Sequence, residues 1–420
     1  MNWKLIAVLA FGIAVFAACQ PVTTSNNSNA PANANNANTN KANTNATSST
    51  SKAAPTDLKK LAERIVTQSA GVKENENVLI SGSARDMELL ENLVIEVEKA
   101  GGNAMLEINS ENMTKRSYAE VPEKYDSKEP KLGIALAKAF NVTISVDSSE
   151  TEGLLADVPP ARLAARSKAS VPVGDEFIKN KIRNVNVGNE LYPTEWRAKR
   201  FEMAPDAFAK LFWEGVNIDY TSLQATGEKA RTAFAGKEVE ITHPNGTNIK
   251  FNIESKPAYI SDGIISADDV AKGNFDVYLP AGEAAVIPAA NSGTGKFVIE
   301  KDFFNGKEVH NITLNFENGK LTSMTGEGEG FAALKADYDA RGEGKEILSY
   351  LDLGINPNYV LSPSTKFGNW VSAGMVSLGT GNNVWAGGTN NSTGAAGGHL
   401  AGATVKIDGK VVIENGTLKL

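Results

Sequence analysis

The stretch Val78-Leu79-Ile80-Ser81-Gly82-Ser83 decides the fold class, because it reads as a short buried strand that ends in small, turn-favouring residues. Residues 88–100 follow with apolar side chains at helical spacing, and Gly101-Gly102 ends that pattern. The same alternation continues on both sides, with helical patterns at 57–70 and 135–140 and strand patterns at 104–108 and 142–146. Alternating helices and strands predict an α/β domain with a parallel sheet.

The character of the chain changes near residue 235. Residues 158–232 read as mainly helical, whereas 239–253, with a central Pro-Asn-Gly turn, and 404–413 each predict a hairpin. Strands and glycine-rich loops dominate this second half. We therefore predict an α/β N-terminal domain over 55–232 and a β-rich α+β C-terminal domain over 233–420.

Residues 1–19 resemble a bacterial lipoprotein signal. Lys4 supplies a positive start, an apolar run too short to span a bilayer follows, and Ala17-Ala18 precede Cys19. We expect Cys19 to become the lipid-bearing first residue, and a plain cleaved signal with an incidental Cys is the alternative. Residues 20–54 are rich in Asn, Thr, Ser and Ala, so we expect a disordered tether. These features predict an extracytoplasmic protein that is lipid-anchored to a bacterial membrane, in a leaflet that the sequence does not specify.

Composition argues against several classes of function. The sequence pI is about 5.3 and basic residues form no run, so nucleic acid is not an expected partner. Cys19 is the single Cys, so the mature chain has no disulfide and no thiol nucleophile. No Gly-x-Ser-x-Gly motif is present, and Gly379-Thr380-Gly381 lacks the third glycine of a dinucleotide site. His243 and His310 lie in turn or strand-start sequence, where we expect surface residues rather than ligands.

A series of sequence blocks in the second half occurs in a specific order. The blocks are HPNGTNIKF at 243–251, YLPAGEAAVIP at 278–288, LDLGINPN at 351–358, GMVSLGTGNNVWAGGTNNS at 374–392 and KIDGKVVIENG at 406–416. Together they resemble the thermophilic aminopeptidase T family of metal-dependent aminopeptidases, over nearly the whole chain after the tether. The Leu-Pro-Ala-Gly-Glu block and the order of the blocks carry this resemblance.

The resemblance implies an α/β N-terminal domain, a catalytic C-terminal domain, a homodimer and two divalent metal ions held by carboxylates and histidines. Such a metal pair lowers the pKa of a bound water and polarises the scissile carbonyl of a peptide. The implied cofactor is zinc, cobalt, manganese or magnesium, and the implied substrate is a peptide with a free amino terminus.

Position by position, the family's metal site is only partly present. Glu283 matches the family's first Glu, and Asp352 stands where the family has a second Glu. His399 follows the Gly-Gly-x-Asn-x-Ser block and can replace either the family's His or its Asp. We predict Glu283, Asp352 and His399 as metal ligands for one ion rather than two, with no bound metal as the alternative.

Three further positions depart from the family's pattern. Met375 opens the run Met-Val-Ser-Leu-Gly where the family has His-Ile-Ala-Leu-Gly, and Asn382 falls at the family's Tyr. Ala401 falls at the family's Asp if His399 is its His. A thioether is a poor ligand for these metals and Ala is none, so we expect these residues only to line the pocket, beside Trp385. The sequence assigns no catalytic residue.

Three functions remain open on the sequence. The first is a lipid-anchored metallopeptidase that removes N-terminal residues from peptides. The second is a catalytically inactive homologue that binds peptides or amino acids. The third is a structural or assembly protein that keeps the homodimer implied by the family resemblance. Fold resemblance does not transfer function, because the site has to carry it. The metal content of the purified protein separates the first function from the other two.

Overall fold

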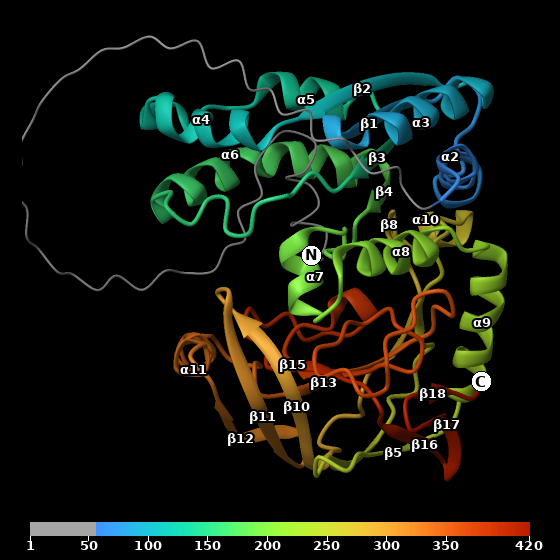
Figure 1. Ribbon diagram of the computed structural model, residues 1–420, viewed down its shortest axis with the longest axis vertical. Helices are drawn as coiled ribbons and strands as arrows, with labels where there is room; N and C mark the ends of the chain where they lie inside the picture. Colours follow the sequence, from blue (N-terminus) through green and yellow to red (C-terminus); the bar gives the residue numbers. More distant parts are fainter. Residues whose placement is uncertain (1–55) are drawn as a thin grey trace, which may run out of the picture.

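The computed structural model describes residues 56–420 of the 420-residue chain (Figure 1). The predicted signal, the lipidation site at Cys19 and the tether at 20–54 lie outside the described residues, and stay predictions. Within 56–420, no helix has the length and apolar character needed to cross a membrane.

A five-stranded parallel sheet forms the upper part of the molecule in Figure 1. Its strands, in spatial order, are β2 (Asn103–Asn109), β1 (Asn77–Ser83), β3 (Val142–Val146), β4 (Arg183–Val187) and β8 (Asp276–Leu279). The helices of this part are α2 (Leu58–Arg64), α3 (Met87–Lys99), α4 (Glu111–Glu120), α5 (Lys131–Ala137) and α6 (Pro160–Lys179). The predicted α/β arrangement is therefore confirmed.

Strand β4 lies inside the segment that the sequence predicts to be mainly helical. The sequence did not predict this strand because it contains Asn184 and Asn186, which look like loop residues. In the structure both are buried, and their side chains form hydrogen bonds to the neighbouring strand β3. The Asn184 amide oxygen accepts from the Thr143 hydroxyl at 2.8 Å, and the Asn186 amide donates to Ser145 at 3.2 Å. The rest of the segment holds the helices α7 (Glu195–Arg200), α8 (Pro205–Val216) and α9 (Tyr220–Ala233).

Two antiparallel sheets form the lower part. The eight-stranded sheet consists of β12 (Lys320–Glu327), β11 (Lys307–Glu317), β10 (Thr294–Phe304), β6 (Asn248–Asn252), β5 (Glu238–Thr242), β16 (Thr404–Ile407), β17 (Lys410–Glu414) and β18 (Thr417–Leu418). The five-stranded sheet consists of β15 (Gly397–Leu400), β14 (Val376–Thr380), β13 (Leu348–Gly354), β9 (Glu283–Val286) and β7 (Tyr259–Ser261). Helices α10 (Ala267–Lys272) and α11 (Phe331–Ala340) complete this half of the chain. Both predicted hairpins are present, as β5–β6 and β16–β17.

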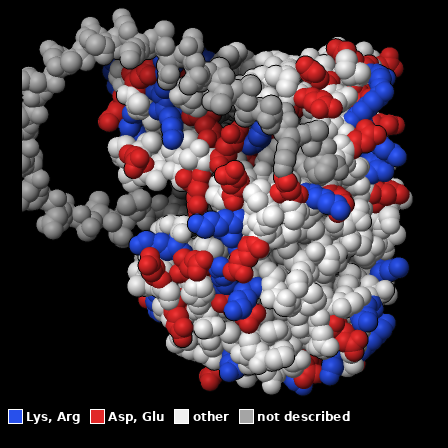
Figure 2. Space-filling model, viewed as in Figure 1, with Lys and Arg blue, Asp and Glu red and all other residues white. Residues whose placement is uncertain are grey.

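The two parts share a strand and a core. Strand β8 comes from beyond residue 232, yet it pairs with β4 and completes the first sheet. One cluster of buried apolar side chains runs through both parts, from Leu61 to Ile413. Figure 2 shows charged side chains gathered on the left of the drawn face, where the two parts meet. The domain boundary near residue 232 stays a prediction.

Candidate functional site

One face of the sheet β15-β14-β13-β9-β7 gathers the predicted site residues. Asp352 on β13 lies directly opposite Ser377 on β14, and Ser377 lies directly opposite His399 on β15. On the other side of β13, Gly354 lies opposite Glu283 on β9. Opposed residues of antiparallel strands point to the same face, as do residues two apart on one strand. Glu283, Asp352 and His399 therefore project from one face of this sheet.

Glu283 and Asp352 lie closer to each other than Asp352 lies to His399. Glu283 and Asp352 are diagonal neighbours on adjacent strands, a relation that places Cα atoms about 7–8 Å apart. Asp352 and His399 have β14 between them, so their backbones are about two strand spacings apart, on the order of 9–10 Å. Among residues 56–420, no three His, Cys, Asp or Glu side chains form a group that could hold a metal ion. The residues present do not fit a two-ion centre, and the metal role of Glu283, Asp352 and His399 stays a prediction.

Two tyrosines lie near the two carboxylates, and a tryptophan packs against both tyrosines. The Trp385 ring packs edge-on against Tyr259 at 5.4 Å and against Tyr350 at 5.7 Å between centroids. The pKa of both phenols is raised above the usual range, first by burial and then by the negative charges of Glu283 and Asp352. Both tyrosines are therefore neutral hydroxyl groups at physiological pH. Glu283 and Asp352 are themselves only 5% and 3% exposed. A ligand that reaches them must enter an aromatic, largely dehydrated environment.

His399 is held by a residue that the sequence reasoning missed. The Ser377 Oγ lies 2.7 Å from the Nδ1 atom of His399, and the Trp370 ring lies 5.6 Å from the imidazole between centroids. Burial lowers the pKa of His399 to about 4, so its imidazole is neutral at pH 7. The available signal for Ser377 was its place in the run Val376–Thr380, which forms β14 between the strands that carry Asp352 and His399.

The three altered family positions lie around the same strands. Met375 precedes β14 and lies near His399. Both side chains pack against Gly368: a methyl group at that glycine would lie 2.6 Å from the Met375 sulfur and 2.9 Å from the His399 Cβ. Ala401 follows β15 and is buried. The backbone carbonyl of Asn382 accepts the indole N–H of Trp385 at 3.1 Å, so Asn382 helps to position that ring. Their role as pocket-lining residues stays a prediction.

Asp276 on β8 lies close enough to Tyr259 for its charge to help raise the pKa of that phenol, and its own pKa is raised. Burial raises its pKa from 3.8 to about 6, while the Asn184 amide donates to its Oδ1 at 3.1 Å. A carboxyl whose folded-state pKa is raised binds its proton more tightly in the folded state. Its ionisation therefore costs stability, progressively from about pH 4 to 6 and fully above pH 6.

We expect Asp276→Asn to stabilise the protein at pH 8, by on the order of 2 kcal/mol, because Asn cannot ionise and keeps the Oδ1 acceptor. Urea unfolding at pH 4.5 and pH 8 checks this result. The free energy of unfolding should fall less between pH 4.5 and pH 8 in the variant than in the wild type. A smaller fall should remain, because burial also raises the pKa of Asp302 to about 6. Asp268→Asn, at an exposed position of α10, is the matched control, and equal stability of Asp276→Asn and wild type at pH 8 would contradict the prediction.

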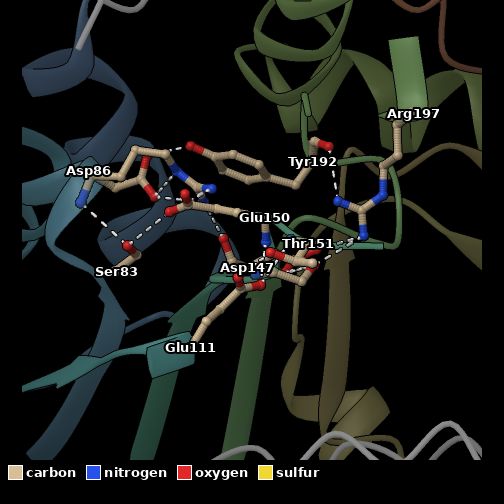
Figure 3. A network of polar contacts seen from close by, with 10 residues as sticks. Ser83, Asp86, Glu111, Asp147, Glu150, Thr151, Tyr192 and Arg197 are labelled. Carbon is tan, nitrogen blue, oxygen red and sulfur yellow. Dashed lines mark hydrogen bonds and ion pairs between the residues drawn. The ribbon is translucent and has the colours of Figure 1, made fainter. Parts of the chain in front are cut away.

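A second polar cluster, also missed by the sequence reasoning, lies where parallel strands of the first sheet end (Figure 3). Arg85 follows β1, donates to the Asp147 carbonyl at 2.7 Å and pairs with Glu150 at 3.3 Å. Arg197 of α7 donates to the Asp147 carboxylate at 3.2 Å, and Glu111 of α4 accepts from the backbone N–H of Glu150 at 2.6 Å. These hydrogen bonds and ion pairs join α4 and α7 to the loops after β1 and β3.

The position of this cluster is the one where open α/β sheets of this strand order bind ligands, because the order in which the chain adds strands to the sheet reverses between β1 and β3. The carboxylates of Glu111 and Asp147 occupy the donors that an anion would use there. We therefore interpret the cluster as a structural link between helices and sheet.

The sequence itself shows the family of the chain. A family model described as thermophilic metalloprotease (M29) matches residues 54–341, which is well over half of the chain. The chain belongs to the M29 family. The resemblance inferred from the sequence blocks is therefore confirmed. The matched range contains Glu283 and ends before Asp352 and His399, so the M29 match does not extend to the strands that carry these two residues.

Two solved structures share the fold of this M29 chain. Wild-type AmpT from Thermus thermophilus matches with a TM-score of 0.62 at 18% identity, and the match covers 86% of this chain and 99% of AmpT. A 2,5-dihydroxypyridine dioxygenase from Pseudomonas putida KT2440 matches with a TM-score of 0.52 at 12% identity, over 86% of this chain and 96% of the dioxygenase. No curated protein matches the chain at a significant level. At these identities the structural matches establish the fold alone.

Proposed function

We propose that this M29 protein is a lipid-anchored aminopeptidase of the aminopeptidase T type, which removes N-terminal residues from peptides outside the cytoplasm. Family membership supports the peptidase class. The observation that carries the proposal is the placement of Glu283 and Asp352 on one face of the sheet, beside Tyr259 and Tyr350, which the Trp385 ring contacts. Two buried carboxylates attract the positively charged amino terminus of a peptide, and aromatic faces favour the same cation.

M29 membership implies the use of a divalent metal. When bound, zinc, cobalt, manganese or magnesium would supply polarisation of the scissile carbonyl and an activated water. No three suitable side chains are grouped within residues 56–420, so these residues do not by themselves fit such an ion. In this chain, Glu283 and Asp352 would bind and orient the free amino group of the peptide, while Trp385 and its two tyrosine neighbours would exclude water.

The proposal is tested with the full-length protein, purified and incubated with each of the four ions in turn. We expect release of the first residue from a tripeptide with a free amino terminus, and none from the same tripeptide after N-acetylation. Mass spectrometry follows the products, and elemental analysis of the protein measures bound metal. Equal cleavage of both peptides would show that the amino terminus is not recognised. Absence of cleavage with all four ions would refute the proposal that the protein is a peptidase.

The second candidate is an inactive homologue that binds peptides or amino acids. Met375 favours it, because a thioether stands where the family has a histidine ligand, close to His399. Calorimetric titration of the protein with the free and the N-acetylated tripeptide separates the two candidates. Binding of the free peptide without cleavage or bound metal supports the inactive homologue. The expected homodimer is measured on the same samples by light scattering.

The anchor is a separate proposal, because Cys19 lies outside the described residues. We expect Cys19→Ala to abolish lipid attachment and to leave the protein unprocessed or released from the membrane, since the chain has no other Cys. Intact mass of the membrane-extracted wild type should show an N-terminal Cys19 carrying acyl chains. A mature wild-type protein that begins at another residue and carries no lipid would refute the anchor.

A further inference from the structure

Strand β2 ends the parallel sheet, at the upper margin of the molecule in Figure 1. Within residues 56–420, no strand pairs with its outer edge. The strand is seven residues long, with the sequence NAMLEIN and no Pro, Lys or Arg. Met105, Leu106 and Ile108 are 43%, 37% and 39% exposed. Unpaired backbone groups and exposed apolar side chains together make such an edge a template for another strand.

The other sheet edges of the described chain are protected. Strands β7, β8, β15 and β18 are at most four residues long. Strand β12 exposes polar residues, among them Lys320 and Glu327, and its pairing with β11 is irregular at two places. Short length, charges and irregular pairing keep the edges of natural sheets from other chains. Of these features β2 has only the partly exposed Glu107, so its edge is expected to be covered.

The backbone of β2 shows which groups a covering strand would meet. The N–H of Asn103 donates to the Glu76 carbonyl at 2.8 Å, on the side of β1. The N–H and C=O of one strand residue point to the same edge, and successive residues alternate between the two edges. Ala104, Leu106 and Ile108 therefore present their N–H and C=O groups at the outer edge.

We propose that the outer edge of β2 pairs with β2 of a second copy of this chain, antiparallel about a two-fold axis at Leu106. In this register Leu106 lies opposite Leu106 of the second copy, and Ala104 lies opposite Ile108. All seven residues of β2 are then paired, and every outward N–H and C=O group has a partner. The two parallel sheets become one continuous sheet across the axis.

The sequence of β2 matches this two-fold register. The strand begins and ends with Asn, and its even-numbered residues are all apolar. Glu107 lies opposite Met105, so its carboxylate meets no like charge. An axis at Glu107 would oppose the two carboxylates, which is unfavourable. An axis at Met105 would leave Ile108 opposite Gly102, outside the strand.

Helix α3 adds a self-complementary surface beside the strand. A groove of about 470 Å³ separates α3 from the edge of β2, and Ile95 is 49% exposed there. The groove is lined by Glu91, Val94, Ile95, Ala104 and Leu106. With the axis at Leu106, Ile95 of each copy faces the other and covers Leu106. Glu91 and Lys99 lie one turn before and after Ile95, so Glu91 of each copy faces Lys99 of the other. This match of charge and backbone hydrogen bonds favours a second copy as the occupant.

Sedimentation of the full-length protein tests the surface. All samples carry Cys19→Ala, which removes the lipid and the chain's own thiol, and contain a mild detergent but no metal or peptide. We expect the parent protein to be a dimer. Leu106→Lys places two ammonium groups at the axis, so the dissociation constant of the dimer should rise by about 100-fold, with unchanged far-ultraviolet circular dichroism. Leu132→Lys, at a leucine of α5 that is 72% exposed, is the matched control and should leave the dimer unchanged.

A pair of cysteine variants tests the register without changing Leu106. Residues of a non-hydrogen-bonded antiparallel pair have Cα atoms about 4.5 Å apart, within reach of a disulfide, whereas diagonal neighbours are about 7–8 Å apart. A mixture of Met105→Cys and Glu107→Cys should therefore form a cross-linked dimer under mild oxidation. Neither variant should cross-link alone. Non-reducing electrophoresis measures the product.

Three outcomes overturn the proposal. They are a monomeric parent protein, an undiminished dimer in Leu106→Lys, and no cross-link in the mixture of cysteine variants. The mixture decides the question even if Leu106→Lys does not fold. The inference goes beyond the proposed function, because failure to cleave peptides would leave these results intact, and a monomer would leave the peptidase proposal standing.

Discussion

Replacing Glu283 by Gln should weaken recognition of peptides with a free amino terminus by about 100-fold, whether it is measured as kcat/KM or as a dissociation constant. Loss of one partner of a buried charged interaction costs about 2–5 kcal/mol, and about 1.4 kcal/mol is tenfold. Glu283 is 5% exposed, so bulk water cannot replace the lost charge. The amide keeps the shape of the side chain, so the far-ultraviolet circular dichroism should match that of the wild type.

The control for this prediction is Glu317→Gln, at an exposed position of β11, which should behave as the wild type. The N-acetylated peptide is a second control, because its neutral end should lose nothing when the Glu283 charge is removed. An equal loss for the free and the acetylated peptide would mean that Glu283 acts through the structure of the site. Unchanged recognition of the free peptide would remove Glu283 from the site.

Phe212→Ala should lower the free energy of unfolding by about 3–5 kcal/mol, because it leaves a cavity where a large ring was fully buried. Phe212 is 0% exposed on α8, and its ring lies 5.0 Å from Trp213 and 5.4 Å from Tyr192 between centroids. The Tyr192 hydroxyl in turn donates to Asp86 in the cluster of Figure 3. The cavity therefore lies beneath the contacts between α7, α8 and the first sheet.

Urea unfolding followed by tryptophan fluorescence measures this loss. Phe212→Leu should cost clearly less, because it refills part of the cavity, and Lys210→Ala on the exposed side of α8 should be nearly neutral. A loss below about 1 kcal/mol in Phe212→Ala would mean that the neighbouring rings collapse into the space.

The alternating pattern around residues 78–83 was enough to predict the α/β part, because buried parallel strands read as short apolar runs. It was not enough for β4, where Asn184 and Asn186 look like loop residues until their partners on the neighbouring strands are known. It could not place β8 either. Pairing between strands far apart along the chain is set by packing of the whole molecule and not by a local pattern.

The candidate site shows the same limit. Glu283, Asp352 and His399 could be named from sequence blocks, and they do project from one face of one sheet. Their spacing could not be predicted, because it depends on the register of β13, β14 and β15. That register inserts Ser377 between Asp352 and His399, and so separates the histidine from the carboxylates.

Strand β8 also sets the timing of folding during synthesis. Strand β4 ends at Val187 and its partner β8 ends at Leu279, so 92 further residues (279 − 187) must be made before the pair can form. At about 5–20 residues per second, a ribosome needs roughly 5–20 s for that stretch. During this interval one edge of β4 has no strand to bond with, and an open edge recruits other chains. A nascent chain that stalls between these two strands should therefore be a strong client of chaperones that bind exposed strand edges.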